Sequence, residues 1–248
     1  MKKFLDTSPS LLKPADLVIT FTKKKSEELA LPGRTIITFD SGDLKRALNA
    51  KRHRLVEAWA PFRWIYRFDD SDTIITKSYF GGPNVAALVE ELSAFGVKEF
   101  ILWGYCGSIS EELSVGDRLI AKGALREDGT SCHYLDDRST FVFTDWFGSW
   151  ENEARDQGIR EGLVWSCDAI YRETRDKVKK YAGMAISAVE MEIASFYAVC
   201  TFKKLKGIAF LVVSDSLVDT KWQPGFSTKP FRQGARKMTE FIMAKVVQ

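Results

Sequence analysis

The sequence lacks long apolar runs, closely spaced cysteines and a strong excess of either charge. No stretch of its 248 residues approaches the roughly 20 apolar residues of a membrane-spanning helix. Only two apolar residues follow Met1-Lys2-Lys3, so no signal peptide is expected. These absences predict a cytoplasmic protein without a membrane partner.

Signals for metal binding and disulfides are also scarce. The four cysteines, Cys106, Cys132, Cys167 and Cys200, are widely spaced, and none belongs to a C-x-x-C pair. This spacing argues against a zinc site or a disulfide framework, and it suits a reducing compartment. We therefore expect no metal site.

Basic residues are scattered, and the formal net charge is only +3. The densest runs are Lys23-Lys24-Lys25 and Lys51-Arg52-His53-Arg54. Neither run continues into a basic stripe interleaved with aromatic residues. Both are interpreted as solvated faces, and nucleic acid is not an expected partner.

What the sequence does contain is an alternation of strands and helices that fits one α/β domain over residues 1–248. A strand over Thr73–Tyr79 leads through Gly81-Gly82-Pro83-Asn84 into a helix, and Phe100–Trp103 leads into a second glycine turn, Gly104–Ser108. This order is typical of a parallel sheet covered on both faces. Further strands are predicted at 16–21, 35–39, 64–68, 116–121, 163–166 and 207–213, helices at 149–158, 173–181 and 231–246, and a functional loop at 125–145.

Three carboxylates stand where strands are predicted to end. Glu190 and Glu192 follow a short apolar run, and Asp215 follows the apolar strand that ends at Val213. Each has a structural explanation, because acids are favoured in the first turn of a helix and at its N-cap. Each also has a functional one, because ligands bind outside the carboxyl ends of strands in open α/β sheets. A carboxylate there can accept hydrogen bonds from vicinal hydroxyls or protonate a leaving group.

Five segments together resemble the nucleoside phosphorylase/nucleosidase family, which contains bacterial purine nucleoside phosphorylase, uridine phosphorylase and methylthioadenosine nucleosidase. In chain order they are Gly104–Ile109 with Val115-Gly116-Asp117, Asp128–Tyr134, Ser166–Tyr171, Val189–Glu192 and Val213–Asp215. The resemblance covers roughly residues 15–245, and Val-Glu-Met-Glu with a downstream Ser-Asp is its most specific part. It implies a three-layer α/β/α sandwich with a central mixed sheet, of the phosphorylase/hydrolase-like kind.

The resemblance also implies roles for individual residues. Glu192 resembles the acid that binds ribose hydroxyls, Met191 the residue that packs on the sugar, and Glu190 a neighbour of sugar or base. Asp215 resembles the acid that protonates a purine ring nitrogen as the base leaves. The other implied positions are a base pocket at Ile170, Tyr171, Cys106, Gly107 and Ser214, a phosphate or nucleophile side at Gly82, Tyr105 and Lys24, and a loop histidine, His133, that serves a neighbouring subunit in some members.

The sequence departs from the family on the nucleophile side. Phosphorylases of the family carry an arginine in the strand before the Gly-x-x-Gly turn, where this chain has Leu102, and a serine or threonine where it has Tyr105. Their first loop reads Gly-Asp-Pro with a following arginine, and we matched it to residues 20–25, which are rich in lysine. Nucleosidases place a glutamate in that loop, whereas Glu27 and Glu28 come slightly later.

We therefore predict an enzyme that cleaves the N-glycosidic bond of a purine-type nucleoside by phosphorolysis, giving free base and ribose 1-phosphate. Inorganic phosphate would be the co-substrate, and no cofactor is expected. A cationic loop favours an anionic nucleophile over water. Two alternatives stay open, namely a hydrolytic nucleosidase and a non-catalytic member that binds a nucleoside. The resemblance also implies a homo-oligomer, either a dimer or a trimer of dimers.

Overall fold

A computed structural model describes residues 4–136, 139–219 and 221–247. Within this part of the chain, eleven strands form one mixed sheet. They are β1 (Arg34–Thr38), β2 (His53–Leu55), β3 (Ile65–Phe68), β4 (Thr73–Lys77), β5 (Glu99–Ser108), β6 (Arg118–Glu127), β7 (Phe141–Phe143), β8 (Arg160–Cys167), β9 (Ile186–Glu190), β10 (Lys206–Ser216) and β11 (Gln223–Pro224).

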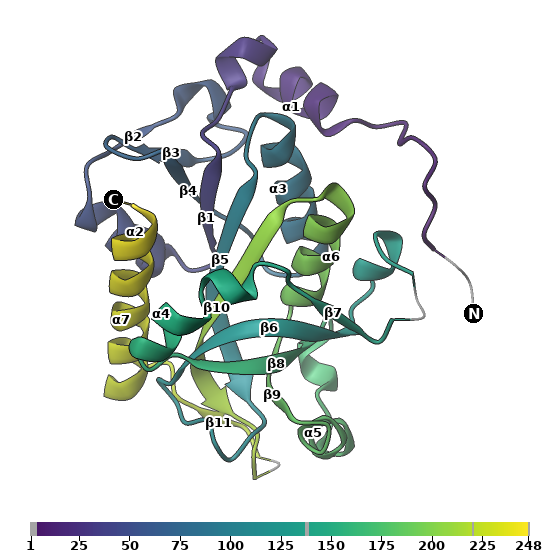
Figure 1. Ribbon diagram of the computed structural model, residues 1–248, viewed down its shortest axis with the longest axis vertical. Helices are drawn as coiled ribbons and strands as arrows, with labels where there is room; N and C mark the ends of the chain where they lie inside the picture. Colours follow the sequence, from purple (N-terminus) through teal and green to yellow (C-terminus); the bar gives the residue numbers. More distant parts are fainter. Residues whose placement is uncertain (1–3, 137–138, 220, 248) are drawn as a thin grey trace.

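Helices cover both faces of this sheet, so the predicted three-layer α/β/α architecture is confirmed (Figure 1). One apolar core packs α1 (Pro14–Thr22), α3 (Gly82–Ala94) and α6 (Ile193–Lys203) against the sheet. A second core packs α2 (Ser41–Ala50), α4 (Glu151–Asp156) and α7 (Lys229–Val246) against the other face. The remaining elements are α5 (Arg175–Ala182) and the short 3₁₀ helices η1 (Ser26–Leu29), η2 (Glu57–Trp59), η3 (Ser131–His133), η4 (Phe147–Ser149) and η5 (Ile170–Arg172).

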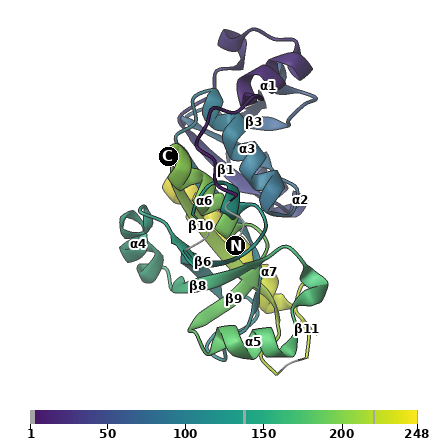
Figure 2. The same ribbon diagram turned by 90° about the vertical axis from the view of Figure 1, so that its right-hand side faces the viewer.

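Five of the strands close on themselves. β5 pairs in parallel with β10, which pairs with β6, and β6 pairs in parallel with β8. β8 pairs with β9, and β9 returns to β5 through Gly107↔Val189 and Ser108↔Ala188. The ends of β5, β9 and β10 therefore meet around Gly107, because its register partners include both Val189 and Asp215. Figure 2 shows α5 and β11 together at one end of the molecule and α1 at the other.

The segment 16–21 is a helix, and its prediction as the first strand was wrong. Its β-branched residues suggested a strand. Pro14, however, occupies the first turn of α1, where a proline needs no hydrogen bond, and Lys23 ends the helix with a left-handed backbone at φ +56°. The hydroxyls of Thr20 and Thr22 donate to the carbonyls four residues earlier, at 2.7 and 2.8 Å. The first strand of the sheet is β1.

Gly104–Ser108 is not a turn but the continuation of β5. Its glycines serve close packing rather than a change of direction. A Cβ on Gly104 would lie 3.2 Å from the Phe39 ring, and one on Gly107 would lie 3.2 Å from Oδ2 of Asp215. The predicted loop at 125–145 is also shorter than expected, because β6 extends to Glu127 and β7 begins at Phe141.

Two searches of the described residues found nothing. None of their helices is long and apolar enough to cross a membrane. No group of three or more His, Cys, Asp or Glu side chains among them is arranged to hold a metal ion.

Candidate functional site

Glu192 is held at the start of α6 by a hydrogen bond from another element. It directly follows β9 and Met191, and its side chain is 7% exposed. The backbone N–H of Gly81, at the start of α3, donates to its Oε1 at 2.7 Å. A hydrogen bond from the backbone of Met191 also lowers the pKa of this carboxyl. The Gly81 N–H therefore orients the carboxylate from another element. Half-buried Met191 lies beside it in the chain.

Both carboxylate oxygens of Glu190 accept hydrogen bonds from other groups of the protein. Its Oε2 accepts the backbone N–H groups of Glu192 and Ile193 at 2.6 and 2.7 Å, and its Oε1 accepts the Ser166 hydroxyl. The same hydroxyl accepts the N–H of Ala194 at 2.8 Å. These contacts satisfy donors that the first turn of α6 would leave unpaired. The geometry thus supports the structural explanation of Glu190 as an acid at a helix start.

Burial makes both glutamates harder to ionise. It raises the pKa of Glu192 to about 7, against hydrogen bonds from backbone N–H groups that lower it, and the Asp168 charge adds to the increase. Burial and the neighbouring Glu192 charge raise the pKa of Glu190. Two buried carboxylates this close titrate as a pair. Each of the two therefore keeps its proton more readily than an exposed glutamate does.

Asp215 has a donor on each oxygen. The Ser214 hydroxyl lies 2.6 Å from Oδ1, and the indole N–H of Trp222 donates to Oδ2 at 3.0 Å. β11 pairs back onto β10 through Asp215↔Pro224, which brings Trp222 over the strand end. Gly107 lies beneath, where the carboxylate leaves no room for a Cβ. Asp215 lies within β10 and is not the N-cap of a helix.

The predicted base-side residues lie in three different settings. Ile170 and Tyr171 form η5 at the end of β8 and are 54% and 96% exposed. Cys106 is buried, and its thiol pKa is raised by burial and then by the charges of Asp215 and Glu190, so it lies near both acids. The Ser214 hydroxyl is also within 3.1 Å of the Cys106 carbonyl oxygen.

Two further residues at this end were not predicted. Glu173 follows η5, and burial together with the Asp215 charge raises its pKa to about 7. Trp222 holds Asp215 as described above. The sequence offered a signal for Glu173, because it lies only two residues after Tyr171. The sequence offered no signal for Trp222, because its contact with Asp215 depends on the pairing of β11 with β10.

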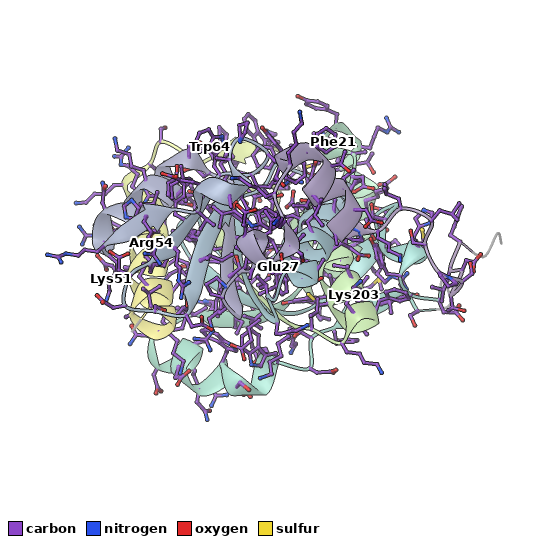
Figure 3. All side chains as sticks on the ribbon, turned by 90° about the horizontal axis from the view of Figure 1, so that it is seen from above. Phe21, Glu27, Lys51, Arg54, Trp64 and Lys203 are labelled. Atoms are coloured by element: carbon purple, nitrogen blue, oxygen red, sulfur yellow. The ribbon has the colours of Figure 1, made fainter. Side chains whose placement is uncertain are left out.

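The structure does not bring Lys24 to this site. Lys24 is exposed and pairs with Glu28 at 3.4 Å. The segment that follows it packs against the C-terminal end of α3, where the N–H of Leu31 donates to the carbonyl of Phe95 at 2.8 Å. The site lies at the opposite end of α3, at Gly81. Figure 3 looks onto the end that carries α1, and it labels Phe21 and Glu27, which flank Lys24.

The segment that follows the first strand is therefore 39–43, not 20–25. It contains Gly42-Asp43 in the first turn of α2, and Arg46 follows on the same helix. This corrects the predicted departure from the family pattern, because a Gly-Asp pair with a following arginine is present, with Leu44 in place of proline. The Arg46 guanidinium bonds the Asp43 carboxylate, whose Oδ2 accepts the Tyr105 hydroxyl at 2.5 Å.

Tyr105 and Gly82 have clear packing roles. The Tyr105 ring lies 4.9 Å from the ring of Phe231 in the core on the α2 and α7 side of the sheet. Burial raises the pKa of the Tyr105 hydroxyl, and the Asp40 charge adds to this. A Cβ on Gly82 would lie 2.1 Å from the Ser195 hydroxyl oxygen, so glycine allows α3 to start against α6.

The loop that bears His133 is anchored near Glu192, through Asp128 and Asp168. Asp128 accepts the backbone N–H of Ser131 at 2.7 Å and the hydroxyl of Ser195 at 2.5 Å. The N–H of Gly129 donates to Asp168 at 2.7 Å. His133 is exposed, and its ring lies 5.3 Å from the ring of Phe4. Its service to a neighbouring subunit stays a prediction.

The family profile described as Phosphorylase superfamily matches residues 36–247. A guanosine phosphorylase of Halorubrum lacusprofundi is 34% identical over 156 residues, which are 61% of this chain and 64% of that protein. The chain thus spans less than two thirds of the length of this relative.

Two solved structures share the fold. A uridine phosphorylase from Vibrio fischeri superposes with a TM-score of 0.76 at 17% identity and covers 89% of this chain and 94% of its own. A purine nucleoside phosphorylase from Toxoplasma gondii, in complex with immucillin-H, gives 0.77 at 19% identity, with coverage of 90% and 92%. The profile matches residues 36–247, well over half of the chain, and the chain belongs to the phosphorylase superfamily.

Proposed function

We propose that this protein is an enzyme that cleaves the N-glycosidic bond of a purine-type nucleoside by phosphorolysis, giving the free base and ribose 1-phosphate. The observation that carries the proposal is the carboxylate of Glu192. It is buried at a strand end and oriented by the N–H of Gly81. Such a group suits the vicinal hydroxyls of a ribose.

The acids of the site suit the charge that develops during this reaction. The ribosyl group becomes oxocarbenium-like only as the bond breaks. A buried carboxylate next to it therefore stabilises the transition state more than the substrate. Glu190 acts here by holding the start of α6 and hence the position of Glu192.

The base end requires a proton donor, and we assign Asp215 to this role. A departing purine anion takes a proton at a ring nitrogen, and an acid within hydrogen-bond reach supplies it. Ser214 and Trp222 hold the two oxygens of Asp215 at the strand end. The purine-type base is further supported by relatives named guanosine phosphorylase and purine nucleoside phosphorylase.

The test is a panel of purine and pyrimidine nucleosides, incubated with the protein with and without inorganic phosphate, with the released sugar identified. We expect ribose 1-phosphate from purine nucleosides only when phosphate is present. Free ribose in the absence of phosphate would instead identify a nucleosidase. Binding of nucleosides without release of any base would identify a non-catalytic member.

A further inference from the structure

We propose that Lys77 is the main cation for the phosphate co-substrate, in a subsite formed by the ends of β1 and β4 and the first turns of α2. This inference rests on the proposed phosphorolysis and assigns its nucleophile a place in the fold. The residues that carry it are Lys77, Thr38 and Ser41, with Arg46 beside them.

The nucleoside side of the site cannot hold phosphate without a cation. Glu190, Glu192, Asp168, Glu173 and Asp215 all face or border it, and like charges repel strongly in a buried setting. The strand arginine that the resemblance implies is replaced by Leu102, which is 1% exposed within an apolar core. Another basic side chain must therefore supply the positive charge.

Lys77 has the required position. It is the last residue of β4 and lies four residues before Gly81, whose N–H orients Glu192. Its ammonium lies 3.2 Å from the Ser41 hydroxyl at the start of α2 and 5.9 Å from the centre of the Tyr79 ring. Parallel strands that end beside a crevice bind ligands beyond their carboxyl ends. A phosphate at Lys77 would thus approach the ribose from the side of Gly81.

Lys77 also has its charge available. Within residues 4–136, 139–219 and 221–247 it forms no ion pair with a carboxylate. By contrast, Arg46 is paired with Asp43, and Lys177 is paired with Glu127 at 2.7 Å. An ammonium bound only to a hydroxyl and a ring face loses little interaction energy when it turns to bind an anion. It also has three N–H donors for that anion.

Two buried hydrogen-bond donors without a partner in the described residues lie on the same side of the sheet as Lys77. Thr38 is fully buried, its Oγ1 has no hydrogen-bond partner in the described residues, and it pairs in register with Lys77. Paired residues of parallel strands project to the same face. The Nε of Arg46, on the helix that covers this face, is also buried without a partner. Such groups require an explanation, and an anion accepts from both.

The experiment measures phosphate binding and phosphorolysis on Lys77→Met, which removes the charge and keeps a long side chain. We expect the KM for phosphate to rise about tenfold to a hundredfold, as for loss of a charged hydrogen bond. The KM for the nucleoside should change by less than about twofold. Lys77→Arg should retain most of the phosphate affinity. Lys24→Met, at the other end of α3, is the matched control and should behave as wild type.

A second readout does not depend on turnover. The melting temperature of each variant is measured with and without inorganic phosphate, so that every variant serves as its own reference. Phosphate should stabilise the wild type and Lys24→Met but not Lys77→Met. Equal stabilisation of all three, or an equal rise of both KM values in Lys77→Met, overturns the proposal. A further outcome separates the two proposals. If the wild type forms no ribose 1-phosphate, but phosphate stabilises the wild type and not Lys77→Met, the proposed phosphorolysis is wrong and the phosphate subsite at Lys77 is confirmed.

Discussion

The backbone N–H of Gly81 donates a hydrogen bond to Oε1 of Glu192 over 2.7 Å, and it joins two residues that are 111 positions apart. Gly81 has φ +95°, a conformation that favours glycine. The start of α3 and the start of α6 thereby fix one carboxylate. The carboxylate is therefore oriented by a backbone group before any ligand binds, which is the condition for a preorganised site.

Glu192→Gln should abolish most of the activity without unfolding the protein. The amide oxygen still accepts the Gly81 N–H, but the negative charge that stabilises the ribosyl cation is lost. We expect kcat to fall about a hundredfold to a thousandfold, as for removal of one preorganised electrostatic contact. Steady-state phosphorolysis at saturating phosphate measures this effect.

Glu190→Ala provides the contrast, because Glu190 is fully engaged with the protein. The substitution leaves two backbone N–H groups of α6 and the Ser166 hydroxyl without their acceptor. We expect the free energy of unfolding to fall by about 2–4 kcal/mol. Urea unfolding of both variants measures it. A stable Glu190→Ala protein together with an unfolded Glu192→Gln protein would reverse the two assigned roles.

The glutamate pair should also make stability depend on pH. Burial raises the pKa of Glu192 from its ordinary value of 4.5 to about 7, and that of Glu190 is raised as well. The folded state therefore binds more protons than the unfolded state in this range, so the free energy of unfolding falls as pH rises from about 5 to about 8. Glu192→Gln removes one titrating group and should flatten this slope. Urea unfolding at several pH values tests it, and a wild-type stability that rises over this range would contradict the assignment.

The end of a strand and the start of a helix at Val189–Glu192 were predictable because their signals are local. Val189–Glu192 combines the end of a buried strand with the start of a helix, and both are recognisable from apolar periodicity and helix-start chemistry. The different hydrogen-bond partners of Glu190 and Glu192 could not be predicted from the sequence. These partners include Gly81 and Ser166, which are distant in the chain.

The first strand of the sheet was mispredicted for a physical reason. A run of β-branched residues at 16–21 suggested a first strand, whereas Pro14 starts a helix there and Val18 packs into the core with α3. Because of this error, the first loop of the family was matched to residues 20–25 instead of 39–43. Lys24 was therefore considered in place of Arg46. Gly104–Ser108 was read as a turn because glycine is ambiguous between turns and close packing.

Trp222→Phe should lower turnover through Asp215. Phenylalanine retains an aromatic ring but cannot donate to Oδ2, which leaves only the Ser214 hydroxyl to hold the carboxylate. We expect kcat to fall about tenfold, in line with one hydrogen bond to a charged group, with a smaller change in nucleoside KM. Trp64→Phe removes another exposed indole, on the edge near β3, and is the matched control. Equal effects of the two substitutions would remove Trp222 from the mechanism.

Asp215→Asn should reduce turnover far more than substrate binding. Asparagine keeps the size of the side chain and an oxygen for the Trp222 N–H, but it cannot protonate the leaving base. We expect kcat for a purine nucleoside to fall about a hundredfold to ten-thousandfold, the usual range for loss of general acid catalysis, with KM nearly unchanged. A ribosyl substrate with a nitrophenolate leaving group provides the control, because this anion departs without a proton. Asp215→Asn should cleave that substrate at close to the wild-type rate, since the ribose end with Glu192 is intact. If both substrates lost activity equally, Asp215 would be positioning the nucleoside rather than protonating its base.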